Sequence, residues 1–319
     1  MLVENAGMLT TIQDNGRIGC RQFGFSTNGC MDNLAPYLIN IMLENPVTTA
    51  VIEYTLMGPV LYFSVDSIIC IGGGMSEPQL DGVPVPCWTP LNIAAGQRLA
   101  LGNVYQGCRG YLAVKGGLNI PPVLSSRSTY LRAGIGGFKG RALEEGDEIP
   151  IIACHRKAPE YQPTWELTHY LDSVAPIRYV QSTQYDWFTP QSQHDFSSRS
   201  YTISSESDRM GYRLTGTALQ KKYPQELLSE GVCPGSIQVP NDGQPIVLMS
   251  DCQPTGGYPK IGQVASVDLA ALAQRQPGQT VHFQNITVSQ AHQALRRRQL
   301  DLQRLGIAVS YKWSELNHV

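Results

Sequence analysis

The sequence predicts a mainly β protein built from short strands and many turns. The chain of 319 residues contains 31 glycines and 21 prolines, which favour turns and interrupt helices. No strand-like segment is regularly followed by a helical one, so a doubly wound sheet is not expected. Two segments share a Gly-Gln turn that leads into an alternating strand, Ala95–Leu101 and Pro277–Phe283. This likeness is compatible with two similar barrels.

Strands are predicted where short apolar or alternating runs are bounded by Gly, Pro or Asp. In the first half of the chain these runs are Val60–Val65, Ser67–Gly72, Arg98–Gly102 and Gly110–Val114. In the second half they are the segments SIQVP, PIVLMS and TVHFQ, which begin at Ser236, Pro245 and Thr280.

Few helices are expected. Asp32 to Glu44 carries apolar residues at helical spacing, and Pro36 near its start indicates that the regular turns begin after Asp32. Asp268 is a candidate N-cap for the segment LAALAQR, and Ser289 for a last helix.

A change in composition divides the chain. Between Cys154 and Pro176 the sequence has three prolines and little strand pattern. We therefore predict an N-terminal β domain over residues 1–157, a linker over 158–176, and a C-terminal β-barrel domain with a terminal helix over 177–319.

Composition and charge exclude several classes of function. The net charge is −2, and the only dense basic run, Arg296–Arg298, is expected on a solvated helix face, so no nucleic-acid partner is predicted. The chain shows neither a signal peptide pattern nor about 20 consecutive apolar residues, so no membrane partner is expected. The eight cysteines and six histidines are scattered. We expect reduced thiols in a cytoplasmic protein and no metal site.

Two glycine clusters lack the spacing of nucleotide-binding loops. Ile71–Glu77 has no Gly-x-Gly-x-x-Gly pattern, and Gly134–Arg141 lacks the Gly-Lys-Ser/Thr ending of a P-loop. Both are interpreted as turn glycines.

The segment Thr10–Gly19 contains Gln13, Asp14 and Arg17 around Asn15-Gly16, a strong signal for a hairpin turn. These polar residues either face water beside a turn or belong to a site. Ser126–Arg132 places two arginines around hydroxyl groups, which suits an anion or an internal ion pair.

Arg209 and Arg213 lie four residues apart in the segment Ser207–Leu214. Guanidinium groups bind carboxylates and phosphates through parallel donors. An arginine at the surface, or paired with a neighbouring acid, is the alternative interpretation.

The densest group of candidate residues lies in Ser229–Gly262. Polar residues stand there at the ends of apolar strands, and strand ends converge at the mouth of a barrel, where small molecules bind. Gly256 and Gly257 allow close approach of the backbone, and Lys260 can neutralise developing negative charge. Asp251 can accept a proton or orient a donor. Cys252 has no histidine nearby and is interpreted as a packing residue. The candidates of this region are Glu230, Gln238, Asp242, Asp251, Gly256, Gly257 and Lys260.

Four of these segments, in this order, resemble the motifs of the KipA-like family: Thr10–Gly19, Ser126–Arg132, Ser207–Leu214 and Ser229–Gly262. The family is also known as the C subunit of 5-oxoprolinase (PxpC), allophanate hydrolase subunit 2, or the biotin-dependent carboxyltransferase family. The resemblance implies two cyclophilin-like β-barrels, a KipI-like partner (PxpB) and a third component, PxpA. It also implies ATP-dependent cleavage of 5-oxo-L-proline to L-glutamate in the complex.

The resemblance implies roles for the candidate residues. Arg209 and Lys260 would lie over a phosphate or the ring carbonyl oxygen, and Asp251 would bind the ring nitrogen or act as base; these are the three catalytic candidates. The substrate-binding candidates are Gln238, Asp242, Glu230, Arg213, Gly256, Gly257, Gln13, Asp14 and Arg17, the last three closing the site from the other half of the chain. ATP, with or without Mg²⁺, would bind this protein, its partner or both together.

Two other functions stay open. The family includes regulatory proteins that antagonise a kinase inhibitor, which implies partner binding without turnover. It also includes carboxyltransferases that act on urea with carboxybiotin, which would here require separate biotin proteins.

Overall fold

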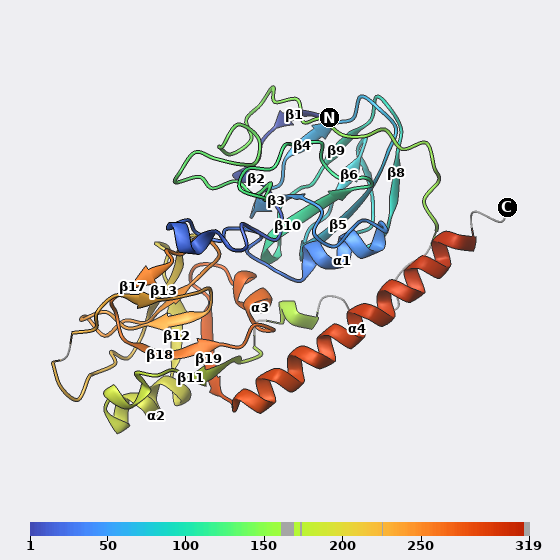
Figure 1. Cartoon of the computed structure of the whole chain (residues 1–319). Coiled ribbons are helices and arrows are strands. Elements are labelled where there is room, and N and C mark those ends of the chain that lie inside the picture. The colour runs from blue at the N-terminus through green and yellow to red at the C-terminus, as the bar shows by residue number, and fades with distance from the viewer. Residues whose placement is uncertain (161–168, 173, 225, 316–319) are drawn as a thin grey trace. The chain divides into compact units, whose positions relative to one another are not determined.

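The computed structural model describes residues 1–160, 169–172, 174–224 and 226–315, and its fold is mainly β, as predicted (Figure 1). The chain forms two units, each with its own hydrophobic core. The first contains Met1–Ile18, the chain from Asp32 to Leu171, and the chain from Gln299 on. The second contains Gly19–Met31 and the chain from Asp172 to Arg298.

This division differs from the predicted domains. The change of unit at Leu171 falls within the predicted linker, of which residues 161–168 and 173 lie outside the described part of the chain. The prediction did not place Gly19–Met31 with the second unit, nor the end of the chain with the first. Contacts between residues far apart in sequence decide both assignments, and composition does not reveal such contacts.

The described strands of the first unit form two five-stranded sheets, and the strand pairs within them are antiparallel. The first sheet has the order β1 (Leu2–Asn5), β4 (Val60–Tyr62), β9 (Arg98–Ala100), β6 (Gln79–Leu80) and β7 (Val83–Pro84). The second has the order β2 (Leu9–Gln13), β3 (Val51–Thr55), β10 (Gln106–Val114), β5 (Ser67–Met75) and β8 (Leu91–Ile93). The resemblance implied a cyclophilin-like β-barrel here, and the described strands of this unit form these two antiparallel sheets.

The core of the first unit draws on both sheets. Val3 and Leu61 come from the first sheet, and Ile52 and Leu112 from the second. Helix α1 (Ala35–Met42) lies against β5 and β10 (Figure 1). The side chain of Ile39 packs onto Gly72. Because β5 has neighbours on both faces, it is a nearly continuous buried run rather than an alternating one.

Helix α1 begins later than Asp32, as Pro36 indicated. The Asp32 carboxylate accepts hydrogen bonds from the backbone N–H groups of Leu34 and Ala35, at 2.8 and 3.1 Å. Asp32 therefore satisfies donors that the first turn leaves without an intrahelical partner. A short 3₁₀ turn, η2 (His169–Leu171), also belongs to this unit.

The second unit is built around a closed seven-stranded barrel. In order around the ring, its strands are β11 (Ile177–Gln181), β18 (Lys260–Val264), β15 (Ser236–Gln238), β16 (Ile246–Leu248), β13 (Gly211–Thr215), β12 (Ser200–Ile203) and β19 (Thr280–Asn285). Only the pairing of β11 with β19 is parallel among these described strands. A separate two-stranded antiparallel sheet, β14 (Glu230–Gly231) and β17 (Thr255–Gly256), completes the described strands.

Aromatic side chains fill the inside of the barrel. Phe196, from helix α2 (Pro190–Ser198), stacks on Phe283 of β19 with ring centroids 4.6 Å apart. Tyr179 and Tyr201 surround the pair, and all four are buried. Two short turns, η1 (Cys20–Phe23) and η3 (Tyr185–Trp187), also belong to this unit.

The two predicted helix caps act differently in the structure. Asp268 precedes α3 (Leu269–Ala273), but its carboxylate binds the Arg178 guanidinium instead of the helix. The last helix, α4 (Val288–Glu315), begins one residue before Ser289, and Thr287 caps it. Thr287 Oγ1 accepts from Gln290 N, while Thr287 N donates to Gln290 Oε1, so a capping box fixes this start.

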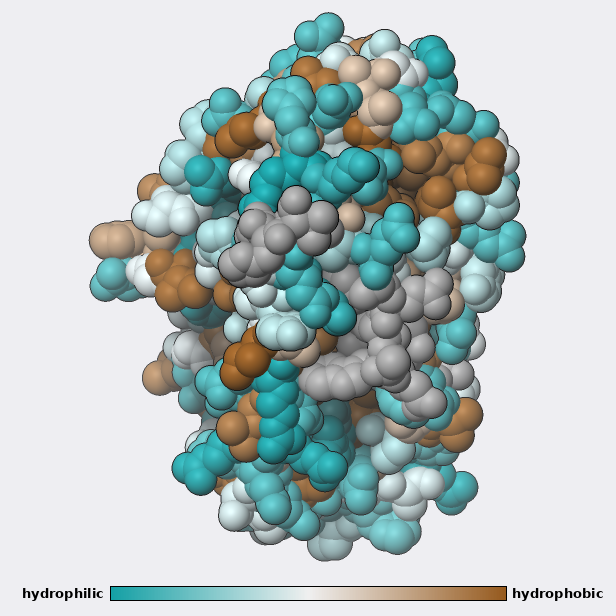
Figure 2. Space-filling view, turned by 90° about the vertical axis from the view of Figure 1, so that its right-hand side faces the viewer, coloured by the Kyte–Doolittle hydropathy of each residue, from teal (hydrophilic) through white to brown (hydrophobic). Residues whose placement is uncertain are grey.

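The face shown in Figure 2 carries hydrophilic residues with smaller groups of hydrophobic ones among them. Within the described ranges, no helix combines the length and the apolar character that crossing a bilayer requires.

Close packing of a glycine gives a test of the first core. A Cβ atom on Gly110 would lie 2.1 Å from Cζ of Tyr54, so Gly110→Ala should lower the free energy of unfolding by about 1–3 kcal/mol through overpacking. Gly306 lies inside α4 with no atom within 4 Å of such a Cβ. Gly306→Ala is therefore the control and should raise stability by about 0.5–1 kcal/mol. Urea unfolding of both variants decides, and similar effects of the two would contradict this packing.

Acid titration tests a second feature of the first unit. Hydrogen bonds from Arg141, at 2.7 and 2.8 Å, lower the pKa of Asp147 from 3.8 to about 2. Because the pKa falls on folding, the resulting stability is present above about pH 4 and is lost as the pH falls toward 2. Asp147→Asn should cost about 1.5–3 kcal/mol at neutral pH, and this difference from wild type should shrink in acid. Glu145→Gln, an exposed neighbour, should show neither effect in unfolding measured across this range.

Candidate active site

Asp251 and Arg209 form a buried ion pair in the second unit. Arg209 Nε lies 2.9 Å from Asp251 Oδ2, and Arg209 Nη2 lies 3.0 Å from Asp251 Oδ1. Both side chains are less than a tenth exposed. The backbone adds a further bond, because Asp251 N donates to Arg209 O at 2.8 Å. The fork of the guanidinium therefore meets the carboxylate in the parallel geometry that gives strong pairing.

The same pair holds a segment from the start of the chain. Asn28 Nδ2 donates to Asp251 Oδ1 at 2.9 Å, and Arg209 Nη2 donates to Gly29 O at 2.6 Å. Ser26 Oγ donates to Asp251 O at 3.1 Å. The ion pair thus fixes Ser26–Gly29 against the barrel. The catalytic roles assigned to Arg209 and Asp251 stay predictions, and both groups are engaged in this contact.

Arg21 anchors the preceding part of that segment. Its Nη2 donates to the carbonyl oxygens of Val232 and Pro254, the latter at 3.1 Å. Cys252 lies close by and is buried, and this burial raises the pKa of its thiol to about 11. The thiol is protonated at neutral pH, which agrees with a packing role.

Lys260 and Glu230 form a second, more accessible ion pair. Lys260 Nζ lies 2.5 Å from Glu230 Oε1, and Gln184 Nε2 donates to the same oxygen at 2.9 Å. The side chain of Glu230 is 37% exposed, whereas that of Lys260 is 12% exposed. The hydrogen bond from Lys260 lowers the pKa of Glu230. The carboxylate is therefore ionised and reaches solvent.

Strand register places Gln238 beside this pair. Gln238 of β15 pairs with Lys260 of β18, and Glu230 of β14 pairs with Gly256 of β17. A Cβ on Gly256 would lie 2.5 Å from Gln238 Nε2, so a larger residue there would displace this amide. Gln238 Nε2 is buried and has no hydrogen-bond partner among the described residues. An unpaired buried donor costs about 1–3 kcal/mol and commonly marks a water or ligand position.

Four sequence-predicted candidates therefore come together: Glu230, Gln238, Gly256 and Lys260. Gly257 follows directly, and a Cβ added to it would lie 3.2 Å from Leu227 O and 3.4 Å from Ser229 Oγ. Sequence reasoning missed Gln184, which lies in an irregular stretch without a motif. Its participation depends on the fold of the turn before η3.

Asp242 and Arg213 lie elsewhere in the second unit. Asp242 stands in the turn between β15 and β16, where its Oδ1 accepts from Gln244 N at 3.0 Å. Arg213 of β13 is 57% exposed, and its Nε lies 4.0 Å from Glu206 Oε2. The surface interpretation of Arg213 thus describes its position. The binding roles assigned to both residues stay predictions.

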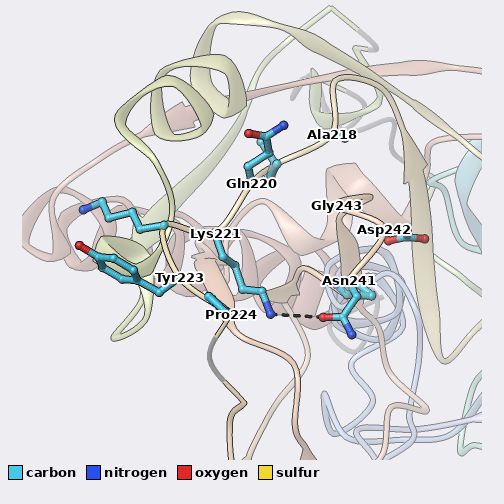
Figure 3. A pocket seen from close by; sticks show the side chains of 11 residues that line it. Ala218, Gln220, Lys221, Tyr223, Pro224, Asn241, Asp242 and Gly243 are labelled. Atoms are coloured by element: carbon cyan, nitrogen blue, oxygen red, sulfur yellow. Dashed lines mark hydrogen bonds between the residues drawn. The ribbon is translucent and has the colours of Figure 1, made fainter.

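Asp242 lines a cavity of about 470 Å³ between the segments 218–224 and 240–243. Figure 3 shows Lys221 reaching across to Asn241, to which its Nζ donates at 3.2 Å. The lining side chains of this open cavity are mostly exposed.

Gln13, Asp14 and Arg17 belong to the first unit. The Asp14 carboxylate accepts from the hydroxyl groups of Ser126 and Ser128, both at 2.6 Å, and Arg17 Nη2 donates to Ser128 O at 2.6 Å. Two motifs that are far apart in sequence therefore meet inside one unit. Their predicted role in closing a site around Lys260 stays a prediction.

Both glycine clusters form hydrogen-bonded backbone structure. The turn interpretation of the first cluster is wrong, because Gly72 to Gly74 lie inside β5. In the second cluster, Gly137 N donates to Arg127 O and Gly140 N to Gly136 O. Within the described ranges, no group of three His, Cys, Asp or Glu side chains could hold a metal ion.

Comparison with known proteins identifies the family. Residues 23–285 match the model of the carboxyltransferase domain, subdomain A and B. The chain is 40% identical to the C subunit of 5-oxoprolinase from Escherichia coli over 301 residues, covering 94% of this chain and 96% of the relative. It is also 40% identical to the protein of the same name in Haemophilus influenzae over 308 residues, covering 95% and 96%.

The fold matches a solved structure as well. The urea carboxylase of Kluyveromyces lactis superposes with a TM-score of 0.85 at 25% identity, over 95% of this chain and 29% of that one. The chain therefore spans less than a third of this structural relative. The resemblance stated from the motifs is confirmed, and the chain belongs to the carboxyltransferase domain family as a relative of the bacterial 5-oxoprolinase C subunits.

Proposed function

We propose that the chain is the C subunit of an ATP-dependent 5-oxoprolinase, a complex that opens 5-oxo-L-proline to L-glutamate. The observation that carries the proposal is 40% identity, over nearly the full length of both proteins, to the 5-oxoprolinase C subunits of two bacteria. The protein would work with a KipI-like partner (PxpB) and a PxpA-like partner.

The proposed chemistry overcomes the low reactivity of the lactam carbonyl group toward water. Transfer of the γ-phosphoryl group of ATP to the ring carbonyl oxygen releases ADP and makes the ring carbon electrophilic. Water adds to this carbon, the C–N bond breaks to free the amine, and a second water releases phosphate from the resulting acyl phosphate. Such transfer depends on cations over the phosphoryl oxygens and on groups that orient the ring.

Lys260 is the residue of this chain best suited to stabilise the developing charge. Its ammonium lies at a strand end beside an ionised carboxylate and an unpaired amide donor. Arg209 is engaged by Asp251 and Gly29, so in our proposal the Arg209–Asp251 pair acts by holding Ser26–Gly29 in place. Neither glycine cluster offers a free phosphate cradle, which favours an ATP site shared with the KipI-like partner.

Carboxyl transfer is the second candidate function. The superposition on urea carboxylase favours it, although identity to the 5-oxoprolinase C subunits is higher. It would require separate biotin proteins as carriers. The regulatory alternative predicts an assembled complex without turnover.

A reconstitution assay tests the function and the role of Lys260 together. Phosphate and glutamate release from 5-oxoproline plus ATP would be measured for the chain alone, with the KipI-like partner, and with both partners. Glutamate should form only with the full set. Lys260→Met should lower turnover about 100- to 1,000-fold. Lys222→Met, an exposed lysine, should leave turnover unchanged. A fully assembled complex that releases no glutamate would instead direct attention to regulation or to urea and carboxybiotin.

A double-mutant cycle tests the Arg209–Asp251 pair. Arg209→Met or Asp251→Leu alone leaves a buried charge unpaired and should lower the free energy of unfolding by about 3–5 kcal/mol. The double variant should lose less than the sum, yet stay inactive because the bonds to Asn28 and Gly29 are gone. Glu206→Gln, at an exposed pair, should change stability by less than about 0.5 kcal/mol. Additive single effects would show that the pair does not act as one unit.

A further inference from the structure

The two oxygens of Glu230 have different environments. Oε1 takes both contacts, from Lys260 Nζ at 2.5 Å and from Gln184 Nε2 at 2.9 Å. No described residue donates a hydrogen bond to Oε2, and the Glu230 side chain is 37% exposed. The ammonium of Lys260 carries three N–H donors, so its contact with Glu230 leaves others for a ligand. An acceptor and a donor therefore stand side by side at the first residues of β14 and β18.

We propose that the Glu230–Lys260 pair recognises the cis-amide edge of its substrate. Lys260 Nζ donates to the carbonyl oxygen, and Glu230 Oε2 accepts the neighbouring N–H. The assignment rests on the proposed function, since it names the chemical group of 5-oxoproline that this site reads.

The chemistry of small lactams fits this order of donor and acceptor. A five-membered ring holds the amide cis, so its N–H and C=O point to the same side. An ordinary peptide bond is trans and points them to opposite sides. Urea carries the same cis arrangement of N–H and C=O. One pair of donor and acceptor groups can therefore bind either a lactam or a urea. An ionised carboxylate only accepts hydrogen bonds, so it demands an N–H from the ligand.

Gln184 acts as a positioning residue in this assignment. It is 5% exposed, and its Oε1 also accepts a long bond, 3.4 Å, from Lys260 N. The Gln184 amide therefore connects β18 to Glu230 and holds Glu230 Oε1 in place. Glu230 Oε2 is then the carboxylate oxygen that remains for the ligand. The alternative is that the Glu230–Lys260 pair only joins β14 to β18. Replacing the ring N–H of the ligand by oxygen would then change the affinity equally in the wild type and in a Glu230 variant.

The test compares 5-oxo-L-proline with its lactone analogue, 5-oxotetrahydrofuran-2-carboxylate, in which a ring oxygen replaces the N–H. Both are titrated calorimetrically into the assembled complex without ATP. The wild type should bind the lactone about 10- to 100-fold more weakly, because an unmatched acceptor faces Glu230. In Glu230→Gln the amide can donate to the ring oxygen, so the two affinities should lie within about threefold.

Two further variants sharpen the result. Glu226→Gln makes the same change at an exposed neighbouring acid and should keep the wild-type ratio. Gln184→Leu should reduce the ratio as Glu230→Gln does, an effect that a merely structural role would not produce. An unchanged ratio in Glu230→Gln, with turnover of 5-oxoproline intact in the wild type, overturns the assignment alone. A wild-type complex that neither binds nor opens 5-oxoproline overturns the proposed function, and this assignment with it.

Discussion

The buried contact between Arg209 and Asp251 is the constraint on which the second unit's site region depends. Two charges removed from water are stable only when each is paired and hydrogen-bonded. Here the pair also binds Asn28 and Gly29, so its stability is coupled to the position of a segment made about 180 residues or more earlier in the chain. The loops that carry Asp251 and Arg209 cannot move independently of that segment.

Strand register then decides which polar groups gather. Pairing of β14 with β17 and of β15 with β18 brings Glu230, Gln238 and Lys260 to one place, with Gly256 leaving room for the Gln238 amide. In our proposal the accessible pair, Glu230–Lys260, and the buried pair, Arg209–Asp251, have different roles. The buried pair fixes the backbone, and the accessible pair meets the ligand.

Much of the fold could be predicted from local sequence patterns. Val60–Val65 and Ser67–Gly72 contain β4 and the start of β5, and Asp32 with Pro36 indicated the start of α1. The cap at Asp268 was wrong because a distant arginine, Arg178, takes its carboxylate. The pairing of Arg209 with Asp251 and the participation of Gln184 depend on contacts across the barrel. Spacing along the chain carries no signal for such contacts.

Each of the two units is built from separate stretches of the chain. Gly19–Met31 is synthesised early but belongs to the second unit, whose other residues begin at Asp172. The first unit in turn receives Trp313, whose indole N–H donates to Met42 O at 3.0 Å across 271 positions. Neither unit is therefore complete when the first half of the chain has left the ribosome. This connectivity makes folding of the whole chain a late event in its synthesis, and it prevents a cut near residue 171 from yielding two whole domains.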